Sequence, residues 1–478
     1  MKTAIAIIIF CFSFLLSSFS QGTLDTVWTI TRGGNLNDEA WAIASDDSNY
    51  LYWATQQQQN GIQEQIIIYK LDENGNQIWE SKHYGITWWN RAFNIKERGD
   101  YIYAAGTGAI NGVLNGPIDA IIICYRKSDG DTVWIRHYNQ GFGYEEIDGM
   151  ELMDDAIYLT GWTKSAGGLA QQDILVLKMD YNGNFLDTAI WGSPGFVEAN
   201  GEMVIDDSTI YITGRWNSTG ATSLFDGDGL MASFNRSDLS FKDSAIYDAG
   251  NFMDDALGLG TDGNYLYAVG YSTNFGNSQQ MTIWKYDKQL NLIWDTAWGG
   301  AGNEFARGII KMSNGHLLIS GNISDAPADP THIMLMEMDL NGTILWYKTI
   351  GTDSADACHN LIEKNGFIYI TGNSKGLNHP NNDAWLLKVG NLFSNIEEQE
   401  NSNLKLQIFP NPVGEEFNIG NLQLTLNTDN RICIYDETGR EIYSSTVSSP
   451  VLKINSYSWS SGIYFLKDSN RVYKLIKM

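Results

Sequence analysis

Carboxylates recur along the chain at a regular interval, and carboxylate oxygens are ligands that calcium prefers. An acid or amide stands near the start of each copy of a repeated segment, with Glu304 offset by one residue. These residues are Glu39, Asn90, Glu145, Glu198, Asp254, Glu304 and Asp356. Copies arranged in a circle would place them in a ring, which is a candidate calcium site. The alternative is structural, because such side chains also accept backbone N–H groups of an adjoining turn.

A second set of acids precedes a very apolar stretch within several copies, and similar turn stabilisation is expected of it. These acids are Asp119, Asp173, Asp228 and Asp383. The segment "FDGDG", which contains Asp226 and Asp228, is an isolated candidate for calcium. No pattern requires a cofactor, and calcium is the ion that these carboxylates favour.

Aromatic residues lie in segments rich in Asn, Gln, Ser and Gly, where exposed rings can stack on sugars or hold an extended peptide. The candidates are Trp88, Trp89, Phe142, Tyr144, Trp162, Trp216, Tyr271 and Phe275. The alternative for each ring is that it covers a seam between neighbouring structural units. These residues predict a surface that binds a polysaccharide or a protein.

Catalytic motifs are present only as letter matches. The run "GLGTDG" from Gly258 falls on a predicted strand and its turn, without the helix that a dinucleotide site needs. Ser374 in "GNSKG" leads into a loop, whereas a nucleophile elbow leads into a helix. The six histidines show no metal-ligand spacing. No catalytic residue is predicted, and a hydrolase or lyase with acids facing each other across a channel remains the enzymatic alternative.

The elements that position these residues repeat seven times. The clearest repeat is a strand ending in Gly, such as "YIYAAG" at Gly106 and "IYLTG" at Gly161, followed by copies at Gly214, Gly270, Gly321 and Gly372. The first copy, "YLYWAT", has Thr55 instead. Each unit of about fifty residues holds four short strands, A to D, which is the signature of a β-propeller blade.

The seventh copy lacks its strand D, which carries a tryptophan in other copies (Trp79, Trp134, Trp294 and Trp346). The segment "TVWTITRGG" near the N-terminus has Trp28 five residues before Gly33, the same spacing as Trp294 and Gly299. We therefore expect the N-terminal strand to complete the last blade and close the ring without an open edge. The B–C loops and D–A links then lie on one face, where variable loops usually carry binding.

Composition excludes some partners and compartments. The chain has 478 residues and a formal charge of −25, which argues against nucleic acid or an anionic membrane surface as a partner. Of its 31 Lys+Arg and 56 Asp+Glu, 8 and 7 lie from Leu404 onward, so the preceding part holds 23 and 49. Residues 1–20 read as a secretory signal peptide. The three remaining cysteines do not make a disulfide framework, and no later segment is predicted to span a membrane.

The C-terminal region has a different pattern. Residues 395–403 are polar and acidic, as in a linker, and residues 21–394 form the predicted propeller. Residues 404–478 alternate apolar and polar residues between the turns "DETG" and "SSG", which predicts a small β-sandwich. The two prolines of "FPNP" preset their φ angles and fix an extended start to its first strand.

Residues 404–478 resemble the C-terminal sorting domain of proteins exported by the type IX secretion system of Bacteroidetes. Three motifs in order carry the resemblance, with Phe409 where Tyr is common. They comprise Pro410, Asn411 and Pro412; then Ile434, Tyr435, Asp436 and Gly439; then Gly462, Ile463 and Tyr464 with the basic Lys474 and Lys477. The resemblance implies a signal peptide, passage through the periplasm, contact with the secretion machinery, and release or display at the cell surface.

The sequence therefore predicts an all-β, exported, seven-bladed propeller followed by a sorting domain. The favoured function is binding of a polysaccharide or protein partner through the B–C loop face. A carbohydrate-active enzyme and a purely structural or adhesive surface protein are the alternatives.

Overall fold

The computed structural model describes two compact units, Met1–Leu392 (unit 1) and Phe393–Met478 (unit 2). The predicted signal peptide and linker lie outside the described residues. The described residues of unit 1 are 26–58, 64–84, 89–108, 118–141, 144–164, 172–192, 198–199, 201–216, 227–248, 253–273, 278–375 and 381–390. Those of unit 2 are 407–409, 416–420, 431–436, 440–446, 452–460, 462–467 and 472–477.

All regular secondary structure in these ranges is β-strand, which confirms the all-β prediction. No helix in them is long and apolar enough to cross a membrane.

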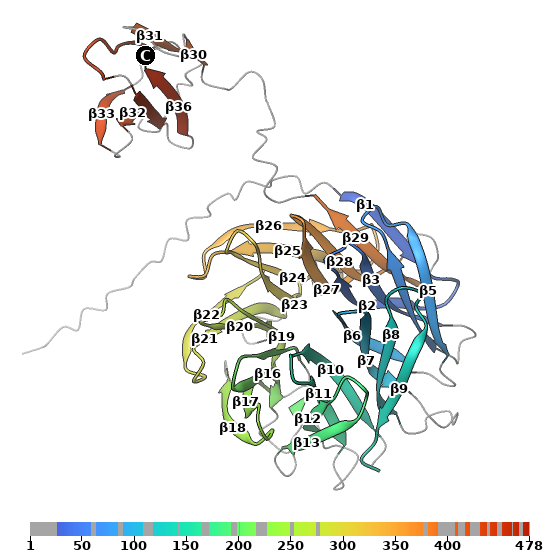
Figure 1. The fold of residues 1–478 in the computed structure, drawn as a ribbon. Coiled ribbons are helices and arrows are strands. Elements are labelled where there is room, and N and C mark those ends of the chain that lie inside the picture. The colour runs from blue at the N-terminus through green and yellow to red at the C-terminus, as the bar shows by residue number, and fades with distance from the viewer. Residues whose placement is uncertain are drawn as a thin grey trace, which may run out of the picture. The chain divides into compact units, whose positions relative to one another are not determined.

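The described strands of unit 1 form seven antiparallel sheets arranged around a common centre (Figure 1). The first three sheets, from the innermost strand outward, are β2 (Asp38–Ser45), β3 (Leu51–Gln58), β4 (Glu64–Leu71), β5 (Gln77–Tyr84); β6 (Arg91–Arg98), β7 (Tyr101–Gly108), β8 (Asp119–Arg126), β9 (Thr132–Tyr138); β10 (Glu145–Leu152), β11 (Ile157–Lys164), β12 (Gln172–Met179), β13 (Phe185–Trp191). The fourth has its innermost strand in two pieces: β14 (Glu198–Ala199), β15 (Met203–Ile205), β16 (Thr209–Trp216), β17 (Asp228–Asn235), β18 (Phe241–Tyr247).

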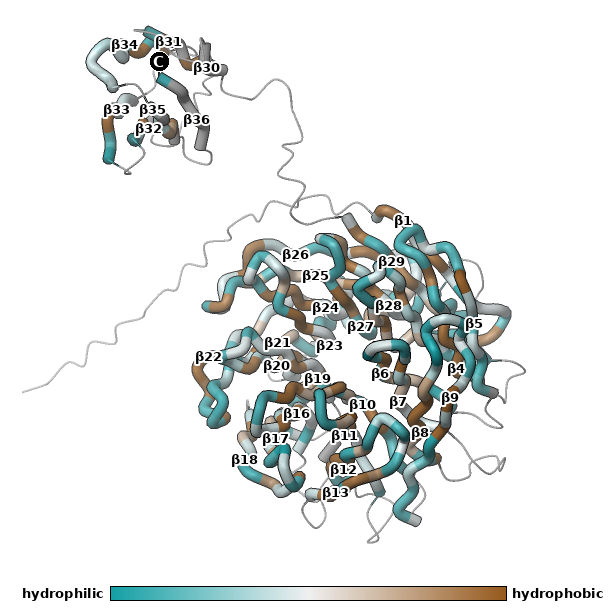
Figure 2. The backbone as a smooth tube through the Cα atoms, in the orientation of Figure 1, coloured by the Kyte–Doolittle hydropathy of each residue, from teal (hydrophilic) through white to brown (hydrophobic). Residues whose placement is uncertain are grey.

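The remaining three sheets are β19 (Asp254–Thr261), β20 (Leu266–Ser272), β21 (Gln280–Tyr286), β22 (Leu292–Trp298); β23 (Glu304–Lys311), β24 (Leu317–Ile323), β25 (His332–Met338), β26 (Ile344–Ile350); β27 (Asp356–Lys364), β28 (Phe367–Lys375), β29 (Asn382–Val389), β1 (Thr26–Arg32). Repeated four-stranded sheets around a centre are typical of a β-propeller. The third strands are the most apolar, and all eight residues of β4 are buried. Figure 2 shows the apolar residues concentrated in the strands and polar residues in the turns.

The repeated glycine of strand B lies inside the strand, not at its end as the sequence pattern predicted; β11, for example, continues to Lys164. A Cβ at Gly106 would lie 2.0 Å from the carbonyl oxygen of Arg91, and one at Gly161 would lie 1.8 Å from that of Glu146. The crowding arises because the innermost strand has a β-bulge at this point. Glycine is therefore required by close backbone approach.

The strand D tryptophans join neighbouring sheets. Trp79 donates its indole N–H to the carbonyl oxygen of Lys127 in the next sheet's C–D turn (3.1 Å). A Cβ at Gly130 in that turn would lie 2.7 Å from the Trp79 ring, and Gly130 has a φ of 79°. Trp134 repeats the contact at 3.2 Å with the turn that contains Gly183. Glycine thus supplies both the positive φ and the space for the ring.

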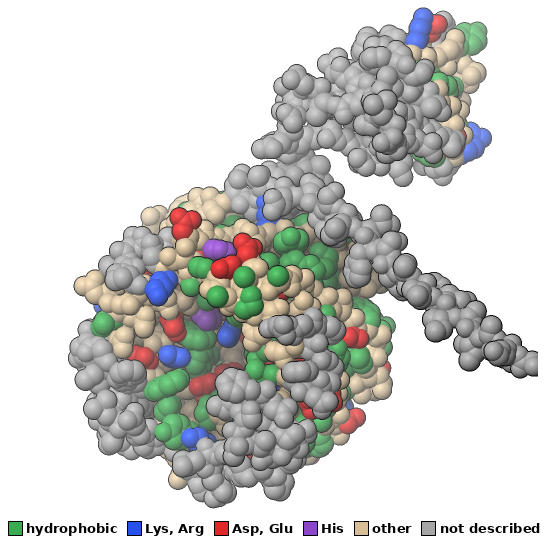
Figure 3. Space-filling view, turned by 180° about the vertical axis from the view of Figure 1, so that it is seen from behind, with side chains coloured by type: hydrophobic (Ala, Val, Ile, Leu, Met, Phe, Trp, Pro, Cys, Tyr) green, Lys and Arg blue, Asp and Glu red, His purple; other side chains and the backbone are tan. Residues whose placement is uncertain are grey.

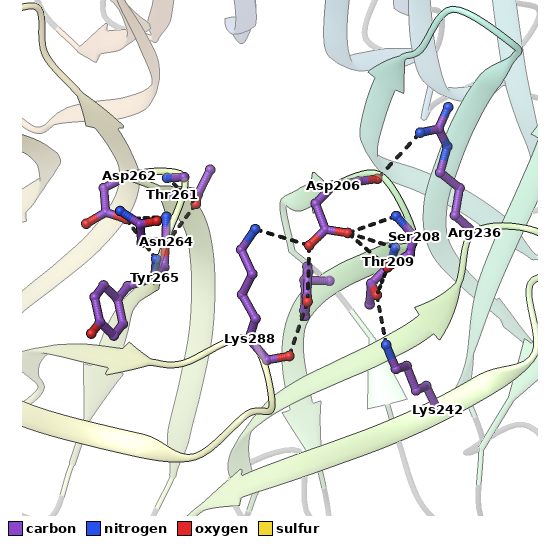
Figure 4. A network of polar contacts seen from close by, with 12 residues as sticks. Asp206, Ser208, Thr209, Arg236, Lys242, Thr261, Asp262, Asn264, Tyr265 and Lys288 are labelled. Carbon is purple, nitrogen blue, oxygen red and sulfur yellow. Dashed lines mark hydrogen bonds and ion pairs between the residues drawn. The ribbon is translucent and has the colours of Figure 1, made fainter.

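Many acids of unit 1 stabilise turns. In the A–B turns, Asp206 accepts the backbone N–H groups of Ser208 and Thr209, and Asp262 accepts those of Asn264 and Tyr265 (Figure 4). The C–D turns use an aspartate that accepts the N–H groups two and four residues later, at Asp72, Asp180, Asp287 and Asp339. These bonds lower the pKa of each aspartate against the effect of burial, so the carboxylates stay ionised and contribute to the acid excess.

The N-terminal strand β1 pairs antiparallel with β29, with Thr29 opposite Leu387. Trp28 donates its indole N–H to the carbonyl oxygen of Glu73 (3.3 Å), and a Cβ at Gly75 would lie 3.5 Å from its ring. This contact has the same form as those of Trp79 and Trp134. The innermost strand β2 packs against β27 of the same sheet that contains β1.

Unit 2 contains two sheets. They are β30 (Gln407–Phe409), β31 (Glu416–Gly420), β34 (Leu452–Asn455); and β33 (Glu441–Thr446), β32 (Arg431–Asp436), β35 (Gly462–Lys467), β36 (Val472–Lys477). Buried side chains from both sheets, such as Phe417, Ile434 and Leu466, form one core. This is the layered arrangement expected of a β-sandwich.

The sorting-motif residues of unit 2 lie on its second sheet where they are described. Tyr435 and Asp436 end β32, Gly462 begins β35, and Lys474 and Lys477 belong to β36. The buried Tyr464 donates its hydroxyl to the carbonyl oxygen of Ser460 (2.7 Å). Pro410, Asn411, Pro412 and Gly439 lie outside the described residues.

Candidate binding site in the centre of unit 1

The register of the innermost strands defines one equivalent start position in every sheet. In six sheets it lies two residues before the residue that pairs with the repeated strand B glycine or its Thr55 counterpart. In the fourth sheet it pairs with Trp216, which stands two residues after the glycine. These residues are Asp38, Asn90, Glu145, Glu198, Asp254, Glu304 and Asp356. The sequence alignment was therefore wrong by one residue in the first copy, where Asp38 takes the position assigned to Glu39. Glu304 is in register, not offset.

The start-position carboxylates stabilise the links between sheets. Asp38 accepts the backbone N–H groups of Gly34 (2.7 Å) and Gln58 (2.8 Å). Glu145 accepts that of Gln140 (3.1 Å), and Asp356 accepts that of Thr352 (2.6 Å). Asp38, Glu145 and Asp356 are each about 1% exposed. These contacts favour turn stabilisation over calcium binding for these three residues.

Among the described residues of unit 1, one acidic cluster has the spacing of metal ligands. Oxygen atoms of Asp228, Asp248 and Asp254 lie within 4.8 Å of one another, with Asp254 buried and Asp248 exposed. Asp248 was not among the predicted residues. Asp226 lies outside the described residues, as does the side chain of Glu198. Calcium at Asp228 and Asp254 remains a prediction.

In six sheets, a β-bulge of the innermost strand places one side chain on the central lining. The bulged residue is the third after the start position, so that the bulge position holds Trp41, Phe93, Asp148, Leu257, Arg307 and His359. In the fourth sheet, Gly201 lies at the same spacing, between β14 and β15. All seven line one cavity of about 250 Å³, the central cavity. Figure 3 shows a hollow in the centre of unit 1 with apolar, acidic and basic side chains gathered around it.

Three carboxyl groups line the central cavity. Burial raises the pKa of Asp148 well above its usual value, and the neighbouring Glu146 raises it further. Glu146 is hydrogen-bonded to Asp148, and burial raises its pKa too. The pair therefore keeps a proton to a higher pH than two exposed carboxyls would. Burial also raises the pKa of Glu202 to about 6, against the attraction of Lys96.

Cationic and aromatic groups line the same cavity. The Trp41 ring stacks on His359 with centroids 4.0 Å apart. The Arg91 guanidinium lies 5.5 Å from the Trp41 ring centroid and 4.8 Å from that of Trp89. Burial, followed by the nearby Arg307, lowers the pKa of His359 to about 3, so its imidazole is neutral at physiological pH.

A second cavity, the seam cavity, lies between the second and third sheets and measures about 310 Å³. It brings together three predicted ligand-binding residues: Trp89, Tyr144 and Trp162. The Trp162 indole donates to Oε1 of Glu146 (3.2 Å), and the Lys164 ammonium lies 3.7 Å from the Tyr144 ring centroid. Glu146 and Trp89 line both cavities, which are therefore adjacent.

Trp89 is held in an unusual conformation. Its φ is 74° and its side chain is 48% exposed. Its backbone N–H donates to Oε2 of Glu64 (2.7 Å), and its carbonyl oxygen accepts from Oγ1 of Thr107 (2.9 Å). A positive φ costs a bulky residue about 1–3 kcal/mol and persists only where surrounding contacts impose it. These contacts hold the backbone of Trp89, and strained residues of this kind cluster at functional sites.

The other predicted aromatic residues do not join this site. Trp216 packs on Trp191 of the preceding sheet with centroids 5.7 Å apart. Tyr271 packs on Phe305 of the following sheet with centroids 6.4 Å apart. Both therefore cover seams, which was the structural alternative. Trp88, Phe142 and Phe275 lie outside the described residues.

Sequence reasoning missed the bulge-position residues and Arg91. The sequence did contain a signal, because each bulge-position residue stands three residues after the start position of its sheet. The bulge itself gives no local sequence signature, and so the spacing carried no meaning before the strand pairing was known.

Comparisons with known proteins identify unit 2. The model of the secretion system C-terminal sorting domain matches residues 407–478. No curated protein matches the chain.

Solved structures show distant similarity to the chain. PorZ of Porphyromonas gingivalis, described as a surface component of the type IX secretion system, has 13% identity over 94% of this chain and 60% of its own, with a TM-score of 0.42. The present chain thus spans less than two thirds of that protein. The WD40 propeller domain of Doa1 has 9% identity over 76% of this chain and 97% of its own, with a TM-score of 0.44. Similarity at this level is no indication of a shared function.

The family match confirms the resemblance drawn from the sequence motifs. A domain of this kind interacts with the secretion machinery that recognises it. Residues 407–478 are thus a secretion system C-terminal sorting domain, which directs the protein through the type IX secretion system to the cell surface or the medium.

Proposed function

We propose that unit 1 is a seven-bladed β-propeller, closed by β1, that binds a glycan outside the cell. Three contacts support closure. The β1 strand supplies the outer strand beside β29. Trp28 contacts the turn at Glu73 as Trp79 contacts the turn at Lys127. The innermost strand β2 packs on β27, as other neighbouring innermost strands pack on each other.

The convergence of Trp89, Tyr144 and Trp162 in the seam cavity carries the binding proposal. Aromatic rings bind the apolar faces of sugars, and the surrounding polar groups can exchange hydrogen bonds with hydroxyls. Lys164 and Gln172 supply N–H donors, and the Glu146 carboxyl supplies acceptors. The cavity thus offers both kinds of group that sugar hydroxyls need.

A glycan fits this cavity better than an extended peptide. A peptide of that kind usually binds by adding a strand to a free sheet edge. The strand β11, which carries Trp162, is already paired with β10 on one side and β12 on the other. Recognition through side chains is therefore favoured here, and a protein partner is an alternative outcome of the test.

The test is a glycan array probed with the purified protein, followed by titration of the best ligand. Trp162→Ala should weaken binding about ten- to hundredfold, because it removes an apolar contact of about 1.5–3 kcal/mol. Tyr271→Ala is the matched control, since Tyr271 also follows the strand B glycine but lies outside the seam cavity. Equal binding by both variants would contradict the assignment. Absence of any glycan ligand would favour a structural or protein-binding role.

The Glu146–Asp148 pair favours a second candidate, a carbohydrate-active enzyme, because a carboxyl that keeps its proton can act as a general acid. However, the two groups are hydrogen-bonded, whereas paired glycosidase carboxyls stand about 5 Å or more apart. Binding is therefore the primary proposal. Release of reducing sugar from an array ligand, lost in Asp148→Asn, would establish the enzymatic function instead.

A further inference from the structure

The central cavity contains two guanidinium groups from sheets that are not neighbours. Arg91 belongs to β6 and Arg307 to β23, and both line the cavity. The sheet of β2 and the sheet of β27 lie between them around the centre (Figure 1). Arg91 directly follows a start position and Arg307 occupies a bulge position, so the strand geometry fixes both side chains on the cavity wall.

Each guanidinium is only partly compensated within the described residues: Arg91 forms one long ion pair, with Glu64, and interacts with the Glu146 carboxyl of the same cavity. The Nε atom of Arg91 lies 3.9 Å from Oε2 of Glu64, which already accepts two backbone N–H groups. Arg307 forms no ion pair within 4 Å in the described ranges; the charge that acts on it most strongly is that of Asp255, which also lies 3.8 Å from Arg215. Guanidinium N–H groups aimed at a cavity are suited to an oxyanion.

His359 adds a hydrogen-bond acceptor between these two arginines. Its Nε2 donates to Oδ1 of Asn373 (2.8 Å). Because the imidazole is neutral, Nδ1 carries a lone pair, and this buried atom has no hydrogen-bond partner among the described residues. The stacked Trp41 also leaves its buried indole N–H without a partner there. A sugar hydroxyl could donate to His359, and another ring oxygen could accept from Trp41.

The negative charge of the protein limits how many anionic groups a ligand of the central cavity can carry and still bind. Residues before Leu404 hold 23 Lys+Arg and 49 Asp+Glu, from totals of 31 and 56 less the 8 and 7 beyond it. A long polyanion would be repelled as a nucleic acid would. A single anionic group meets the two arginines in the cavity, where the surrounding low dielectric strengthens their attraction.

We propose that the central cavity receives one acidic sugar residue of an otherwise neutral glycan, whose oxyanion is bound by Arg91 and Arg307. The inference rests on the proposed glycan binding, with neutral sugars in the seam cavity and the acidic residue beside them. The shared residues Trp89 and Glu146 make this continuity possible. A carboxylate and a sulfate ester share this chemistry, and the experiment distinguishes them.

The experiment compares three small probes by saturation-transfer NMR and titration with the whole protein. Methyl glucuronide carries a carboxylate, methyl glucoside is its neutral counterpart, and a sulfated methyl glucoside carries a sulfate ester. We expect the glucuronide or the sulfate, or both, to bind at least tenfold more tightly than the glucoside. Added salt should weaken the binding of the charged probes only, because salt screens the attraction between their anionic group and the two guanidinium groups.

Variants then assign the binding to the cavity. Arg307→Gln and Arg91→Gln should each reduce binding of the charged probe about ten- to hundredfold, with little change for the glucoside. Arg307→Lys should retain part of the affinity. Arg98→Gln is the matched control, since Arg98 lies on β6 but pairs with Asp154 outside the cavity.

Two results separate this inference from the proposed function. In the first, array glycans bind and their binding is lost in Trp162→Ala, but the charged and neutral probes bind equally and salt has no effect on them. The acidic-sugar inference is then wrong and glycan binding stands. If a charged probe binds and depends on Arg307, while no array glycan depends on Trp162, the seam-cavity proposal is wrong. The salt titration uses the unaltered protein, so a result without any salt effect overturns the inference even where an arginine variant misfolds; the site itself is assigned by Arg307→Lys beside Arg98→Gln.

Discussion

Replacing Glu202 by glutamine should stabilise unit 1 at neutral pH and leave its stability unchanged in acid. Burial raises the pKa of this carboxyl from 4.5 to about 6, with a further contribution from Glu151 and an opposing one from Lys96. The folded protein therefore holds the proton of Glu202 more tightly than the unfolded chain does. Ionising this group costs folding free energy.

The size and pH window of the effect follow from that shift. One unit of pKa corresponds to about 1.36 kcal/mol, so the cost is at most about 2 kcal/mol, and solvent screening of the half-buried group reduces it. Below pH 4.5 Glu202 is protonated in both states and costs nothing. The cost develops as the pH rises through 4.5 to 6 and is complete above 6. Glutamine is neutral throughout and avoids it.

Urea unfolding followed by tryptophan fluorescence measures this difference, because 15 of the 16 tryptophans precede unit 2. Glu202→Gln should show a higher unfolding midpoint than the unaltered protein at pH 8 and the same midpoint at pH 4. Glu80→Gln, on the exposed face of β5, is the control and should change neither. A difference that is independent of pH would refute the reasoning.

Three other outcomes are expected. Trp28→Ala should destabilise unit 1 by about 2–4 kcal/mol in the same urea assay, because it removes the ring that covers the turn at Glu73. Val27→Ala is its control and should cost less than about 0.5 kcal/mol, because Val27 is 51% exposed. Calcium should raise the urea midpoint and Asp248→Asn should abolish the rise; identical midpoints in calcium and chelator would contradict the calcium prediction. Deletion of residues 407–478 should keep the protein inside the cell envelope, as cell-surface labelling would reveal, and continued display would show that another signal directs export.

The strands of unit 1 were predictable because their signals are local. Alternation, apolar third strands and turn glycines are read within a few neighbouring residues, and Gly130 at a C–D turn is an example. The register of the innermost strands depends on pairing with strand B. The adjacent acids Asp38 and Glu39 look equivalent in sequence, and only the pairing of Ala40 with Thr55 tells them apart.

The candidate site was predictable only in part, for a related reason. Trp162 and Tyr271 both follow a strand B glycine, yet one lines a cavity and the other covers a seam. The outcome depends on the residue that faces each ring from the next sheet, Phe305 in the case of Tyr271. Arg307 offered only its spacing of three residues from Glu304, and that spacing has a meaning only once the bulge, which forms when two strands pair, is known.

The pairing of β1 with β29 has a kinetic consequence for folding. Trp385 donates its indole N–H to Oγ1 of Thr29, a residue 356 positions earlier in the chain. A contact of such long range forms slowly, because the intervening chain must be brought into place first. During synthesis from the N-terminus, the first strand therefore has no β29 to pair with until almost the whole of unit 1 has been made. The sorting domain comes later in the chain, so its residues are made only after every described strand of unit 1.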